Sequence, residues 1–129
     1  MATRRDVIGI LDDDTVVRHA LGNLLKALDY RTELYASAEE FLNAEKSEAI
    51  CLIIDVHLGD ISGIELGRQL AATGFKFPII FMTASDDASL RQQALDFGCV
   101  AYLPKPLDAD RLIEAIVNAT GSRAPKTRG

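Results

Sequence analysis

The sequence places a small set of oxygen- and nitrogen-bearing side chains directly after short apolar runs. Three consecutive aspartates follow the first run, and an aspartate, a threonine and a lysine follow later ones: Asp12, Asp13, Asp14, Asp55, Thr83 and Lys105. Carboxylates of this kind suit Mg2+, which takes one or two of them and keeps several waters. A cation, a lysine and a hydroxyl could together neutralise a phosphoryl group that a carboxylate attacks. These residue types therefore indicate phosphoryl chemistry at an aspartate.

Each residue also has an ordinary structural explanation. Acids are favoured at helix N-termini, so we expect Asp14 to cap the helix that follows it. Asp55 could lie in a turn, Thr83 could cap a helix, and Lys105 could be a surface lysine. The chemical interpretation requires all of these side chains to meet at one place, which depends on the fold.

Five apolar runs alternate with five segments of helical period. The expected strands cover residues 7–11, 32–35, 50–54, 78–82 and 100–103. The expected helices cover about 15–28, a short segment after Ser37, 62–72, 86–97 and a segment after Asp108. This alternation predicts an α/β fold, a doubly wound parallel sheet with helices on both faces. Ligands bind at the carboxyl ends of such strands, where the polar residues would converge.

The composition limits the possible functions. A chain of 129 residues fits one domain, expected over 1–121, with 122–129 as a flexible tail or the start of a linker. The formal net charge of −5 argues against direct nucleic acid binding by this domain. The sequence has no apolar stretch long enough for a bilayer and no secretory pattern. Cys51 and Cys99 are interpreted as buried thiols in a reducing cytoplasm.

The complete set resembles the receiver domain of bacterial two-component response regulators, from about Val7 to Ala119. The matching features are Asp12-Asp13, Asp55, Gly63, Met82-Thr83-Ala84 and Tyr102-Leu103-Pro104-Lys105-Pro106. The segments 11–18 and 37–42 are similar to the nitrogen-fixation type of transcriptional regulators. Any one feature is weak, whereas the set in this order is specific.

This resemblance implies the flavodoxin-like strand order 2-1-3-4-5. It implies that Asp55 is the phosphoacceptor and that Lys105 and Thr83 contact phosphoryl oxygens. Mg2+ would be the cofactor, held by Asp13 and Asp55 directly, by the backbone carbonyl of His57, and by Asp12 largely through water.

The resemblance also implies a switch. Tyr102 would turn inward when Thr83 is drawn toward the phosphoryl group, although a partly buried edge-strand aromatic is the simpler interpretation of this tyrosine. The Lys105–Pro106 peptide would be cis. The family often carries Met-Pro where this chain has Leu58-Gly59, and a glycine there is expected to loosen the loop.

The implied function is a signalling switch and not an enzyme, apart from Mg2+-dependent self-phosphorylation from small phosphodonors and slow self-dephosphorylation. The implied partner is a sensor histidine kinase or phosphotransfer protein. Phosphorylation would alter the face formed by the fourth helix, fifth strand and fifth helix, through which a second copy could bind.

Two other classes can be considered. A haloacid-dehalogenase-type phosphatase would use Asp12 as nucleophile, Asp14 as general acid and Thr83 as its second motif. The chain is short for that family, and Asp55 would have no role. A flavodoxin-like nucleotide binder would need a phosphate-binding loop after the first strand, where this chain is acidic.

Overall fold

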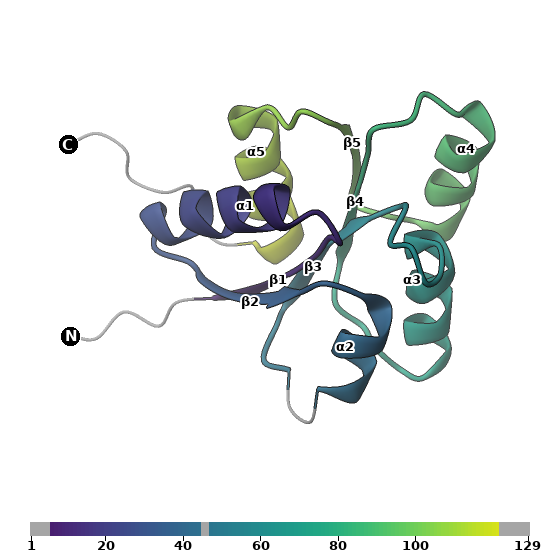
Figure 1. Ribbon diagram of the computed structural model, residues 1–129, viewed down its shortest axis with the longest axis horizontal. Helices are drawn as coiled ribbons and strands as arrows, with labels where there is room; N and C mark the ends of the chain where they lie inside the picture. Colours follow the sequence, from purple (N-terminus) through teal and green to yellow (C-terminus); the bar gives the residue numbers. More distant parts are fainter. Residues whose placement is uncertain (1–5, 45–46, 122–129) are drawn as a thin grey trace.

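The computed structural model describes residues 6–44 and 47–121, in which five strands alternate with five helices (Figure 1). The strands are β1 (Val7–Leu11), β2 (Arg31–Tyr35), β3 (Cys51–Asp55), β4 (Ile79–Thr83) and β5 (Ala101–Pro104). The helices are α1 (Thr15–Ala27), α2 (Ala38–Asn43), α3 (Gly63–Ala72), α4 (Ala88–Phe97) and α5 (Ala109–Thr120).

The strands form one parallel sheet in the order β2-β1-β3-β4-β5, which confirms the predicted topology. Helices α1 and α5 cover one face, and α2, α3 and α4 cover the other (Figure 1). The register pairs Leu11 with Ile54 and Asp55 with Met82, so the strands end at nearly the same level. The residues that follow these strands are therefore neighbours at one edge.

Alternation along the strands divides the core into two layers. Ile10, Ile53 and Ile80 pack toward α1 and α5, whereas Leu52 and Phe81 pack toward the opposite helices. Strands β1, β3 and β4 are buried at every position, as expected for a parallel sheet covered on both faces. The edge strand β2 is only partly covered.

Side-chain caps begin each helix, as the sequence predicted for Asp14, Ser37, Ser62 and Asp108. The predicted capping boxes are only partly right. The Glu40 carboxylate returns to the N–H of Ala36 and not to that of Ser37. The carboxylate of Glu65 pairs with Arg68, its neighbour one helical turn on.

The strand boundaries also differ slightly from the prediction. Strands β3 and β4 each begin one residue later than expected and extend through Asp55 and Thr83, because backbone pairing continues beyond the apolar run. The tail predicted over 122–129 lies outside the described residues. Within the described part of the chain, no helix has both the length and the apolar character needed to cross a membrane.

We expect Gly63→Ala to destabilise the fold, because a Cβ there would collide with the Asp55 carbonyl oxygen and lie 2.7 Å from Cγ2 of Ile54. The expected loss is roughly 1–3 kcal/mol of unfolding free energy. Gly22→Ala is the matched control. Gly22 lies inside α1, and a Cβ there would lie 3.4 Å from the flexible side chain of Leu34. This control variant should be neutral or stabilising by roughly 0.5–1 kcal/mol. Equal urea midpoints for the two variants would contradict this packing account.

Candidate functional site

The polar residues singled out in the sequence meet at the carboxyl edge of the sheet. Asp12 follows β1, Asp55 and Thr83 end β3 and β4, and Lys105 follows β5. Asp12, Asp55 and Thr83 are buried, although each is polar. Such burial is costly unless the groups are paired, so their partners determine what the site can do.

Lys105 joins two of the carboxylates. Its Nζ lies 2.8 Å from Oδ2 of Asp12 and 3.2 Å from Oδ2 of Asp55. The other Asp12 oxygen accepts the N–H of Asp14 at 2.8 Å. Oδ1 of Asp55 accepts the N–H of His57 at 3.1 Å. Both buried acids therefore have a fixed orientation around one ammonium group.

A third acid adds negative charge that the lysine does not balance. Asp13 is exposed, yet carboxylate oxygens of Asp12, Asp13 and Asp55 lie within 4.8 Å of one another. Three carboxylates around one ammonium leave an excess of negative charge, and a divalent cation with oxygen ligands would offset it. The donor set therefore fits Mg2+.

The titration behaviour of the site follows from this crowding. Burial raises the pKa of Asp55, and the Asp12 carboxylate adds to the shift, whereas the His57 N–H and Lys105 oppose it. Partial burial acts to lower the pKa of Lys105, but its bonds and charge attraction to the two acids raise it. Lys105 is therefore held in its charged form, whereas burial disfavours the charged form of the neighbouring Asp55.

The loop between β3 and α3 lies against this cluster. Its base is closed by an antiparallel bridge between His57 and Ser62. Gly59 has φ +97°, and a Cβ at this position would lie 3.3 Å from Oδ2 of Asp13. Proline fixes φ near −65°, so the Met-Pro common in the resembled family is incompatible with this backbone. The glycine at this position thus permits a backbone conformation that a proline could not adopt.

Thr83 and Tyr102 lie on the neighbouring strands. The Thr83 hydroxyl accepts the N–H of Ser85 at 2.9 Å and donates to the Ser85 carbonyl oxygen at 3.3 Å. Asp87, and not Thr83, caps α4. The Tyr102 hydroxyl is buried and has no hydrogen-bond partner among the described residues. The ring packs against the core layer under α2, α3 and α4, so it already points inward.

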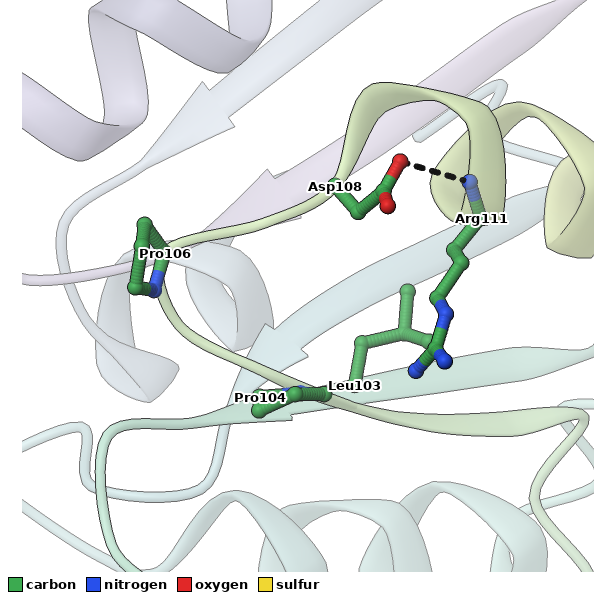
Figure 2. Close-up of a pocket in the computed structure, with 5 residues that line it drawn as sticks. All are labelled: Leu103, Pro104, Pro106, Asp108 and Arg111. Carbon is green, nitrogen blue, oxygen red and sulfur yellow. Dashed lines mark hydrogen bonds between the residues drawn. The ribbon is translucent and has the colours of Figure 1, made fainter.

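The connection from β5 to α5 contains the cis Lys105–Pro106 peptide that the resemblance implied. Figure 2 shows the start of α5, where the Asp108 carboxylate accepts the Arg111 N–H at 3.4 Å and the Arg111 side chain extends toward Leu103. These residues line a hollow of about 110 Å3 together with Pro104 and Pro106. None of these residues belongs to the acidic cluster, although Pro104 and Pro106 flank Lys105 in the chain.

Two residues near the site were not predicted from the sequence. The Arg18 guanidinium donates to the Asp12 carbonyl oxygen at 2.6 Å and fixes the backbone of the acidic loop. The Asp60 carboxylate accepts N–H groups from the first turn of α2. No local sequence pattern predicts the contacts of Asp60. For Arg18, the one indication is its position about one helical turn after Asp14.

The phosphatase alternative is not supported. Asp14, its general acid, instead accepts the N–H groups of Val16 and Val17 as the N-cap of α1. Asp55, which that alternative left without a role, lies in the cluster with Asp12. The comparisons with known proteins also point to another family.

Residues 8–117 match the response regulator receiver domain family. The chain is 37% identical to the response regulator protein TodT of Pseudomonas putida over 99% of its length and 56% of that protein. It is 32% identical to the transcriptional regulatory protein FixJ of Bradyrhizobium diazoefficiens over 98% of its length and 62% of that protein. A crystal structure of a response regulator receiver protein from Burkholderia phymatum has 35% identity and a TM-score of 0.82, covering 94% of this chain and 99% of that one.

The chain spans little more than half the length of the curated relatives it matches. The similarity to FixJ agrees with the nitrogen-fixation type suggested by the sequence. Fold, strand order and family match point to the same conclusion. The chain belongs to the response regulator receiver domain family of two-component signalling systems.

Proposed function

We propose that this receiver accepts a phosphoryl group on Asp55 from a phosphohistidine of a sensor kinase or phosphotransfer protein. The observation that carries the proposal is the geometry of Lys105, which lies within 3.2 Å of Asp55 and 2.8 Å of Asp12 at the carboxyl edge of the sheet. An Asp55 oxygen would form the bond to phosphorus, and the phosphorus–nitrogen bond would break, leaving the partner's imidazole.

The residues around Asp55 have complementary roles in this proposal. Lys105 would attract the added dianion, and Thr83 would donate its hydroxyl to a phosphoryl oxygen. Mg2+ would be held by Asp13, Asp55 and the His57 carbonyl, and would neutralise phosphoryl charge when bound. Both Asp12 oxygens already accept hydrogen bonds, which favours a water-mediated role for Asp12.

The switch would follow from competition for the Thr83 hydroxyl. To reach a phosphoryl oxygen, Thr83 must turn its hydroxyl away from Ser85, which would release the turn after β4. The Tyr102 hydroxyl is buried without a partner in the described part of the chain, and such a group costs roughly 1–3 kcal/mol of free energy. A rearrangement of the turn after β4 that brings an acceptor to this hydroxyl would remove that cost. Tyr102 would then gain a hydrogen-bond partner while its ring stays inward.

The partner surface of the phosphorylated form would be the face of α4, β5 and α5. Val100, which is 39% exposed, immediately precedes β5 and lines a hollow with residues of β5 and α5, so it offers apolar area to a second copy. Direct nucleic acid binding is not part of the proposal, given the formal charge of −5. A cytoplasmic location is proposed from the kinase partnership and from the free thiols of Cys51 and Cys99.

Incubation with acetyl phosphate and Mg2+ should add one phosphoryl group, measured by intact-protein mass spectrometry. Asp55→Asn should abolish the addition because its amide is not a nucleophile, and chelation of the metal by EDTA should nearly abolish it. Asp14→Asn is the matched control, since Asp14 caps α1 outside the cluster. Labelling of Asp12, or undiminished labelling of Asp55→Asn, would contradict the proposal.

Asp55→Asn should also stabilise the unphosphorylated, metal-free protein near pH 7, seen as a rise in the unfolding free energy. The pKa of Asp55 is raised in the folded state, so its ionisation disfavours folding. The difference between variant and wild type should therefore vanish at acid pH, where Asp55 is protonated in both states. Urea titrations across pH would measure it, with the exposed Asp86→Asn as control. A destabilised Asp55→Asn at pH 7 would count against the charge-crowding account.

Beryllofluoride, a phosphoryl mimic, should shift the protein with Mg2+ from monomer toward dimer in sedimentation velocity. Val100→Glu should prevent dimerisation, because it places a charge in the apolar face, and it should leave phosphorylation unchanged. Val16→Glu is the control, since Val16 is 77% exposed on α1. Dimerisation that survives Val100→Glu but fails in Val16→Glu would place the interface elsewhere.

A further inference from the structure

The Asp60 carboxylate connects two segments that lie far apart in the sequence. Asp60 belongs to the loop between β3 and α3, and its oxygens accept the N–H groups of Glu39 at 3.1 Å and Ala38 at 3.4 Å. These are the first two residues of α2, and Ser37 accepts the next free N–H, that of Glu40, at 3.0 Å. The first turn of α2 is thus capped jointly by its own N-cap and by a carboxylate from another loop.

The loop that carries Asp60 is the one that lies against the acidic cluster. His57, at its start, donates its N–H to Asp55, and Gly59 lies beside the Asp13 carboxylate. The bridge between His57 and Ser62 closes the base of the loop. Gly59 gives its tip wide conformational freedom. Leu58 and Ile61 pack into the core on either side of this tip, and the bonds from Asp60 to α2 are the polar contacts that fix it to another element.

The strength of this contact is indicated by the titration of Asp60. Desolvation acts to raise the pKa of the carboxyl, but the N–H groups of Glu39, Ile61 and Ala38 together lower it below its ordinary value. The carboxylate is therefore bound in its charged form, which the N-terminal end of a helix favours. An exposed acid that binds backbone donors 21 and 22 residues away acts as a tertiary cap.

We propose that Asp60 is a positioning residue that holds the 57–62 loop against the cation site, so that α2 and bound Mg2+ stabilise each other. This inference rests on the proposed Mg2+ site and adds a residue that does not touch the ion. The loop supplies the His57 carbonyl to the proposed site, so an untethered tip would have to be ordered when the ion binds. By linkage, the ion must then stabilise the Asp60–α2 contact to the same extent.

The test is a Mg2+ titration followed by amide chemical shifts in two-dimensional NMR. Asp60→Ala should weaken Mg2+ binding about fivefold, at the low end of ordinary coupling between sites. Ser37→Ala removes a cap from the same helix without touching the loop, so it should change the affinity less than twofold. In wild type, Mg2+ should also shift the Ala38 and Glu39 amides, and this response should be lost in Asp60→Ala.

Two further variants separate geometry from charge. Asp60→Asn keeps only one of the two acceptor oxygens that bind α2, so its affinity for Mg2+ should lie between those of wild type and Asp60→Ala. Glu39→Gln removes a charge from the same helix turn and should bind normally. If Ser37→Ala or Glu39→Gln weakens binding as much as Asp60→Ala, the proposal is overturned in favour of helix stability or long-range charge. If wild type itself binds no Mg2+, the proposed function fails first.

Discussion

The buried ion-pair arrangement of Lys105 with Asp12 and Asp55 is the interaction on which the site depends. Two acids with almost no exposed surface are held at the end of a hydrophobic sheet, where unpaired carboxylates would be strongly disfavoured. One lysine cannot balance three neighbouring carboxylates, so the cluster retains negative charge. That excess would favour a bound cation, and the ammonium group would attract the phosphoryl group of the proposed function.

The fold makes this arrangement possible because apolar residues fill the length of the strands and polar residues stand at their carboxyl ends. Every residue of β3 is buried, and Leu52 and Ile53 anchor the strand in opposite core layers. Only its last residue, Asp55, reaches the edge where the loops meet. Because neighbouring parallel strands end at the same level, a residue following β1 and another following β5 can share one partner.

The loops around the edge link the site to the rest of the molecule. The Thr83 hydroxyl accepts the N–H of Ser85 in the turn before α4. The Asp60 carboxylate accepts the N–H of Glu39 in the first turn of α2. A charge added at Asp55 would compete with the first contact, whereas an ion at the cluster would reinforce the second. Side chains at this edge thus contact the loop before α4 and the first turn of α2, while the buried Tyr102 hydroxyl on β5 has no hydrogen-bond partner among the described residues.

The sequence by itself determined the parallel α/β fold and the helix caps, because periodicity and capping depend on residues near one another in the chain. The predicted parallel sheet in turn placed the acids and Lys105 at one edge, because the carboxyl ends of its strands meet there. Only the tertiary structure decided which atoms meet. The contacts of Asp60 with α2 and of Arg18 with the Asp12 carbonyl depend on loop conformation and on distances across elements. The positive φ of Gly59 and the inward packing of Tyr102 are likewise set by neighbours that no local pattern specifies.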